Sequence, residues 1–235
     1  MSKMIGLARP LKIEWMNKTV DLLLEGKPID EIKTELNNYL SFEIDTPTSL
    51  RKTRESLINI WALDSDEMND VRKFALSLYL ASPDKLPLHW CMLLIKYPIF
   101  TDICALIGKI SNIEESFTTA WIREKLYESW GERTSLDVPV KNILRTLVDF
   151  EALEKMKIGV YKTKTRPVKD ENTICLMMLS LLALRKKAYY EVTELSGLPL
   201  FFPFNYDVTH ELISGVKDIN VGNFGGKLVV SLKDE

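Results

Sequence analysis

Apolar residues in the N-terminal part of the chain recur at intervals of three and four, a spacing typical of amphipathic helices. The first of these helices ends at Gly26, the second follows Pro28, and the third opens at Thr46-Pro47-Thr48. Glycine favours helix ends, and proline is tolerated in a first helical turn. The positions expected to face inward are Ile13, Met16, Val20, Leu23, Leu24, Ile29, Ile32, Leu36, Tyr39, Leu40, Leu50, Leu57, Ile58 and Trp61. We therefore predict an N-terminal three-helix unit over residues 1–65.

Residues 66–112 are expected to supply central, buried helices. A helical stripe runs from Val71 to Tyr79, and two helices that are apolar on most sides follow, separated by Pro98. Helices of this kind are usually buried in a bundle. The most apolar windows, Leu86–Ile110 and Ile174–Leu184, are either interrupted by charged residues or too short to cross a bilayer. We interpret both as core helices, and we expect no membrane partner.

Residues 113–170 have the outline of a winged helix. A helix ending near Trp130-Gly131 is followed by a polar turn and by a second helix that opens at Asp137 with a regular apolar stripe. The face opposite that stripe is expected to hold Lys141, Asn142, Arg145 and Asp149. The β-prone run Ile158–Tyr161 then leads into a basic segment. Such a fold can place its second helix in a major groove and its wing along phosphates.

Two basic clusters stand out in a chain whose formal net charge is only −2. Residues 157–169 contain five cations and no acid, and we expect this run to form the tip of the wing; it comprises Lys157, Lys162, Lys164, Arg166 and Lys169. The third helix carries a second cluster, Arg51, Lys52 and Arg54. Local asymmetry of this sort is expected where a protein contacts phosphates. The alternatives are a solvated hairpin that serves only packing, and an ordinary solvated helix face on which Glu55 pairs with Arg51.

Residues 171–235 are predicted to form a C-terminal helix followed by a β-hairpin. The helix should span Asn172–Lys187, a second helix Asp207–Val216, and the hairpin should turn at Asn223–Gly226. Between them lies an aromatic and proline-rich loop, Leu198–Phe204. We favour this loop as a plug in the core, with an exposed docking patch as the alternative. The helix-then-hairpin outline echoes that of the winged-helix-like segment.

The sequence offers little chemistry for catalysis. The three cysteines, Cys91, Cys104 and Cys175, lie in apolar stretches and suggest buried free thiols in a reducing compartment. The two histidines lie far apart in the sequence, and no zinc-type spacing, Walker loop, GxGxxG turn or GxSxG elbow occurs. We expect no enzymatic activity, no cofactor, no metal and no small-molecule substrate, and His89 beside Trp90 is expected to be a core histidine.

The layout resembles the BrxA family of BREX bacteriophage-defence systems. The resemblance rests on the N-terminal helical unit with the helix Thr46–Arg54, the buried Leu86–Ile110 region and the helix-turn-helix segment Trp121–Leu153, and it covers roughly residues 10–165. It implies a helical, winged-helix-containing protein that binds double-stranded DNA without catalysis. It also implies that the helix with Arg51, Lys52 and Arg54 and the winged-helix-like segment contact the DNA.

Taken together, these features predict a mainly α protein that is cytoplasmic and binds double-stranded DNA as an accessory subunit of a defence system. The expected contacts are Arg51, Lys52, Arg54, Lys141, Asn142, Arg145, Lys162, Lys164, Arg166 and Lys169. Other subunits of the system are possible further partners. The alternative is a protein–protein adaptor without nucleic-acid contact, for which the aromatic loop would provide the interface.

Overall fold

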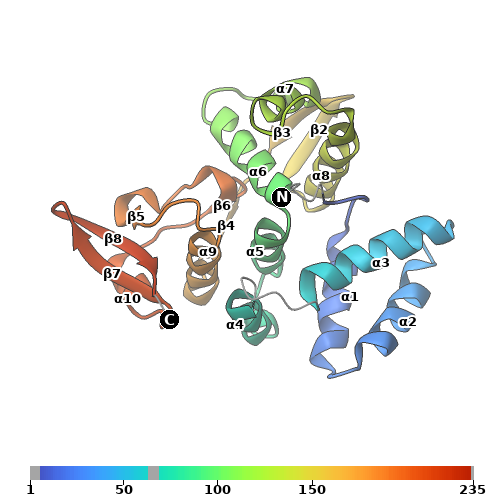
Figure 1. The fold of residues 1–235 in the computed structure, drawn as a ribbon, viewed down its shortest axis with the longest axis horizontal. Coiled ribbons are helices and arrows are strands. Elements are labelled where there is room, and N and C mark those ends of the chain that lie inside the picture. The colour runs from blue at the N-terminus through green and yellow to red at the C-terminus, as the bar shows by residue number, and fades with distance from the viewer. Residues whose placement is uncertain (1–5, 63–68, 234–235) are drawn as a thin grey trace.

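The computed structural model describes residues 6–62 and 69–233, which form a mainly helical fold with small sheets. Figure 1 shows α5 at the centre of the molecule, with the N-terminal helices on one side and the C-terminal part on the other. Helices α6, α7 and α8 and the sheet beside them lie above it. The expected boundary between residues 65 and 66 falls in the segment 63–68, which lies outside the described residues.

The N-terminal three-helix unit is confirmed. It consists of α1 (Ile13–Leu24), α2 (Ile29–Leu40) and α3 (Pro47–Trp61), which pack against one another, and α3 also packs on α5. The predicted stripe of α2 faces inward, since Ile32, Leu36 and Leu40 are all buried. In α1 the prediction for Leu24 is wrong: this last residue of the helix is 39% exposed, and Leu22, which was not selected, is fully buried. The periodicity of the sequence alone was sufficient to predict the three helices, because each helix buries one face.

The central helices are α4 (Asn69–Tyr79), α5 (Leu86–Lys96) and α6 (Pro98–Ser111). Helix α5 packs on α9 (Glu171–Ala183) as well as on α4 and α6. As expected, His89 is a buried core residue: its Nε2 lies 2.8 Å from Asn17 Oδ1, and Tyr79 donates to the same oxygen at 3.0 Å. Burial lowers the pKa of His89 to about 3, so the ring is neutral. This buried polar group joins α1, α4 and α5.

No single helix in residues 6–62 and 69–233 is both long and apolar enough to span a bilayer. Helices α5 and α6 satisfy those criteria only as a pair, and the pair is bent by 118°.

The segment predicted to resemble a winged helix, residues 113–170, follows α6 and contains β1 (Phe117–Thr118), α7 (Thr119–Trp130), α8 (Asp137–Asp149), β2 (Leu153–Lys157) and β3 (Val160–Thr163). The strands form an antiparallel sheet in the order β1-β3-β2. The sequence did not predict β1, in which Phe117 pairs with Tyr161. Two residues are too few to show strand periodicity, and the strand exists because β3 supplies its partner.

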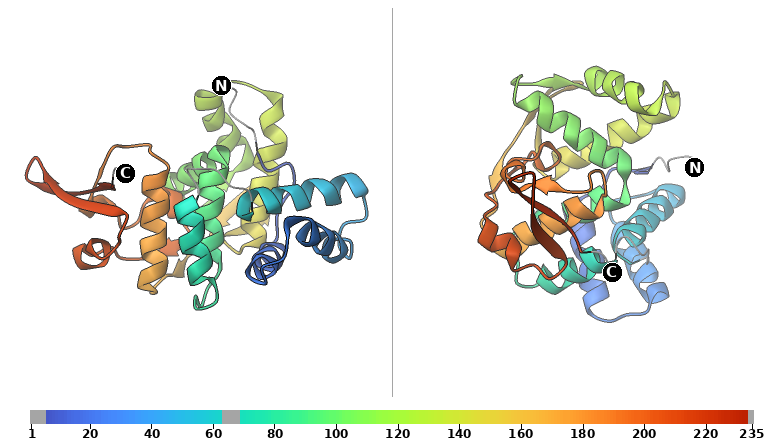
Figure 2. Two further views of the ribbon diagram at one scale, coloured as in Figure 1. Left: turned by 60° about the horizontal axis from the view of Figure 1, so that its bottom comes forward. Right: turned by 60° about the vertical axis from the view of Figure 1, so that its left-hand side comes forward.

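The C-terminal part repeats this strand order. Helix α9, β5 (Tyr190–Glu191), α10 (His210–Ser214), β7 (Ile219–Phe224) and β8 (Lys227–Leu232) follow one another, and the sheet has the order β5-β8-β7 with antiparallel pairs. The predicted hairpin is confirmed, and it projects from the body (Figures 1 and 2). Both predicted helices are shorter than expected: α9 ends at Ala183, and α10 covers only His210–Ser214. The outline recognised in the sequence therefore reflects a repeated topology.

The aromatic loop between β5 and α10 is part of the core. Its short 3-10 helix η4 (Pro199–Phe201) packs on α6, Phe201 is fully buried, and Trp90 donates to Leu200 O at 3.0 Å. After it, β6 (Phe204–Asn205) pairs in parallel with β4 (Arg166–Pro167). The loop is thus the plug that the sequence favoured.

Candidate nucleic-acid interface

Helix α8 presents one narrow exposed ridge. Its inner face, which includes Ile143 and Leu147, is buried, as the apolar stripe in the sequence predicted. Val138, Lys141 and Arg145, spaced by three and four residues, are exposed together on the outer face. Among the residues that the structure describes, neither Lys141 nor Arg145 has an ion-pair or hydrogen-bond partner. The ridge therefore carries two positive charges without partners in the described chain, and the exposed Asp149, four residues after Arg145, ends it and accepts a hydrogen bond from Ile13 N at 3.3 Å.

Asn142 was predicted as a contact residue on this ridge, and that prediction is wrong. The side chain is only 8% exposed, and its Nδ2 donates to Leu7 O at 3.2 Å. The segment before α1 runs along this flank of α8, where Leu11 N donates to Thr146 Oγ1 at 2.9 Å. In Figure 1 this segment passes between α8 and the N-terminal helices. Helix periodicity places Asn142 beside the ridge, but it cannot show that a distant part of the chain covers that flank.

The wing is the hairpin of β2 and β3, with Ile158-Gly159 at its tip. Lys155 and Lys157 of β2 are exposed, and neither has an ion-pair or hydrogen-bond partner for its ammonium group within the described part of the chain. The sequence analysis included Lys157 only as part of a basic run and missed Lys155. Residues 153–157 read Leu-Glu-Lys-Met-Lys and do not alternate between apolar and polar positions, so their pattern did not place the two lysines on a strand.

The prediction that the basic run 157–169 forms the tip of the wing is wrong for its residues from Lys162 onward. Lys162 lies in β3, away from the tip, and its Nζ forms an ion pair with Glu115 at 2.6 Å. Glu154 stands directly opposite it on β2. The hydrogen bond that Lys162 donates to Glu115, with the negative charges of Glu115 and Glu154, raises the pKa of Lys162. Its positive charge is therefore compensated within the protein.

Arg166 also has its partners within the protein. It belongs to β4, and its guanidinium donates to Asp84 Oδ2 and to Phe150 O, both at 3.2 Å. Lys164 and Lys169 are exposed, and their ammonium groups have no partner among residues 6–62 and 69–233, but both residues follow the hairpin and neither is at its tip. The five cations that the sequence grouped together are thus divided among a wing strand, an internal strand pair and a linker.

The cations of α3 belong to another part of the surface. Arg51 and Lys52 are exposed, whereas Arg54 donates to Glu55 Oε1 at 2.5 Å and to Asn37 Oδ1 at 3.0 Å. Glu55 thus pairs with Arg54, and not with Arg51 as the solvated-face alternative proposed. Helix α3 packs on α1, α2 and α5, and its first turns lie at the outer end of the N-terminal unit (Figure 1). The structure does not join this cluster to the α8 ridge.

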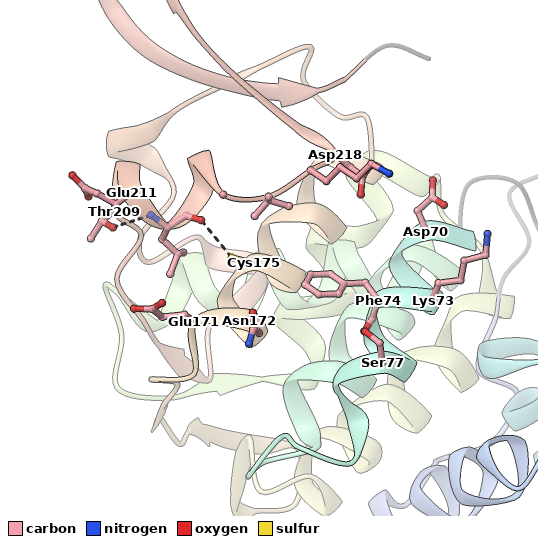
Figure 3. A pocket seen from close by; sticks show the side chains of 14 residues that line it. Asp70, Lys73, Phe74, Ser77, Glu171, Asn172, Cys175, Thr209, Glu211 and Asp218 are labelled. Atoms are coloured by element: carbon pink, nitrogen blue, oxygen red, sulfur yellow. Dashed lines mark hydrogen bonds between the residues drawn. The ribbon is translucent and has the colours of Figure 1, made fainter.

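A cavity of about 810 Å³ lies between α4, α9 and α10 (Figure 3). Phe74, Cys175 and Leu212 contribute apolar surface to it, and Cys175 Sγ lies 3.6 Å from Leu212 O. Burial raises the pKa of the Cys175 thiol, which keeps it protonated and a poor nucleophile. The carboxylates and lysines at its rim are Asp70, Glu171, Glu211, Asp218, Lys73 and Lys217. No group of metal-ligating side chains occurs here or elsewhere in the described residues.

Comparisons with family models, with curated proteins and with solved structures found no match to this chain.

Proposed function

We propose that this protein binds double-stranded DNA through its winged-helix segment, without catalysis. The observation that carries the proposal is the α8 ridge, where Lys141 and Arg145 project from a helix that follows a helix-turn-helix connection. In winged helices the corresponding helix enters the major groove. Two cations without internal partners can replace counterions on phosphates or donate to base edges.

The wing adds two further positive charges beside the α8 ridge. Lys155 and Lys157 are exposed on β2, and β2 packs beside α8. Wings of this fold lie along the phosphate backbone next to the groove that the helix occupies. With an overall net charge of −2, affinity should depend on these few residues and should fall steeply with salt.

The adaptor alternative loses its main support, because the aromatic loop on which it relied is buried against α6. An accessory role in a BREX-like defence system remains a proposal that rests on the resemblance of layout. Adjacent genes for a methyltransferase and a large ATPase would favour that role, and their absence would count against it.

The test is a salt series of fluorescence-anisotropy titrations with a labelled duplex. Each phosphate contact contributes about 0.9 to the slope of log K against log salt, so K141A/R145A should flatten the slope by up to about 2. Its affinity at low salt should fall at least about tenfold. The matched control is R51A/K52A, which removes the same charge from α3 and should bind nearly as the wild type does.

An unchanged slope in K141A/R145A would remove α8 from the interface. An equal loss in both double variants would show that general charge, and not the α8 ridge, governs binding.

A further inference from the structure

The wing tip together with the end of β2, residues 155–159, exposes two apolar side chains beside two lysines. Ile158 is 93% exposed and Met156 is 56% exposed. They alternate along the chain with Lys155 and Lys157, whose charges the described residues leave uncompensated. Full burial of such an apolar side chain is worth about 1.5–3 kcal/mol relative to leaving it in water. A tip of this composition suits a partner that is anionic at its edges and apolar within.

The tip is held in place by the fold. Gly159 has a φ of +73°, which a left-handed turn requires, and its carbonyl accepts a hydrogen bond from Thr119 N at 2.9 Å. Met156 sits at a bulge in β2, where the register with β3 shifts between Lys155 and Lys157. Bulges redirect side chains out of the regular strand pattern. The hydrogen bond to the start of α7 means that Ile158 projects from an anchored turn.

We infer that the wing tip is a wedge that enters the minor groove of the bound duplex and inserts Ile158 against a base step. The inference rests on the proposed DNA binding and extends it to a mode of contact. Proteins that bind the minor groove often insert an Ile, Leu, Met or Phe between base pairs and bend the duplex by 20–90°. The minor groove is about 6 Å wide, which suits a two-residue turn, and the phosphates at its edges attract the two lysines.

A membrane surface is the other kind of partner that combines anionic and apolar character. Two apolar side chains bury little area in a bilayer, and stable anchoring by one weak signal is marginal. The continuity of the tip with the α8 ridge through β2 favours the duplex.

The test compares two duplexes of about 30 base pairs and equal sequence, one continuous and one with a central unpaired bulge that is already kinked. Unstacking a base step costs a few kcal/mol, and a duplex that is already kinked avoids part of this cost. If about 1.4 kcal/mol is avoided, the affinity rises tenfold. The wild type should therefore bind the bulged duplex about tenfold more tightly. I158S and M156S should lose that preference and still bind the continuous duplex. The fluorescence of a 2-aminopurine base placed beside the bulge should increase on binding of the wild type only.

The matched control is I113S, because Ile113 is 79% exposed in the loop before β1, outside the wing. It should retain the tenfold preference. All these positions are exposed, so circular dichroism should show unchanged folding.

Equal affinity of the wild type for the two duplexes would overturn the wedge and leave the proposed binding through α8 standing. Failure of the wild type to bind either duplex would overturn both. Co-sedimentation with phosphatidylserine vesicles that I158S abolishes, without any duplex preference, would assign the tip to a membrane.

Discussion

Substitution of Gly108 by alanine tests the packing of the aromatic loop on α6. Gly108 is a buried residue within α6. Helix propensity alone predicts that G108A stabilises the protein by about 0.5–1 kcal/mol, because glycine costs that much in a helix interior. The structure predicts the opposite sign. A Cβ atom at this position would lie 2.1 Å from Pro199 O and 2.6 Å from both Pro199 C and Cα.

These are backbone atoms, so no change of rotamer relieves the overlap. The loop must move away from α6 by roughly an ångström, and overpacking of this kind costs about 1–3 kcal/mol. The same shift strains the hydrogen bond from Trp90 Nε1 to Leu200 O, a net contribution of about 1 kcal/mol. After the propensity gain is subtracted, we expect G108A to lower the free energy of unfolding by about 1–3 kcal/mol.

The assay is urea denaturation followed by tryptophan fluorescence and by circular dichroism, which gives the free energy of unfolding and its denaturant dependence. A control in the same helix, A105G, should cost no more than about 1 kcal/mol, the propensity difference alone. The double variant G108A/P199A should be no more stable than G108A, because the overlap involves the Pro199 backbone. If G108A stabilised the protein, the close approach of η4 to α6 would be wrong.

Two further predictions concern the core. F201A should destabilise the protein by about 3–5 kcal/mol, since Phe201 is fully buried, whereas a docking residue would leave the urea midpoint unchanged and weaken only association. The second prediction concerns His89, whose pKa is about 3 in the folded protein, whereas an ordinary histidine has a pKa of 6.5. Between these two values the unfolded state binds a proton that the folded state does not bind, so the free energy of unfolding decreases as the pH falls through this window. Between pH 7 and pH 5 the wild type should lose about 2 kcal/mol more than H89Q. Equal losses in urea titrations at the two pH values would mean that His89 is not buried as a neutral ring.

The structure also explains why the basic run 157–169 does not form one cluster of unpaired positive charges at the wing tip. Charge density along a chain does not show which cations have partners across the fold. Lys162 meets Glu115, and Arg166 meets Asp84, in each case a residue far away in the sequence. Lys141 and Arg145, which have no ion-pair partner among the described residues, are ordinary members of an amphipathic helix and do not stand out by composition.

The repeated strand order is likewise a property of the fold and not of a repeated sequence. The two hairpins show no sequence repeat, yet β1-β3-β2 and β5-β8-β7 have the same connections. The second unit has a short α10, and a long loop stands where the first has α7. Its Lys227 is paired with Glu191 at 2.7 Å, so its wing offers less positive charge than the first.

Helix and strand periodicity and turn residues act over a few neighbouring positions, and they were enough to predict the helices and the C-terminal hairpin. They correctly predicted the buried stripes of α2 and most of those of α1 and α3, the buried α5 and α6, and a helix followed by a turn, a second helix and a hairpin in residues 113–170. Which charged side chains are paired and which lie exposed together depends on packing between distant segments. The strand β1, the covering of Asn142 by the segment at Leu7 and the pairing of Lys162 all depend on contacts between residues far apart in the chain. Local periodicity specifies the face on which a side chain lies, whereas long-range packing decides what lies against that face.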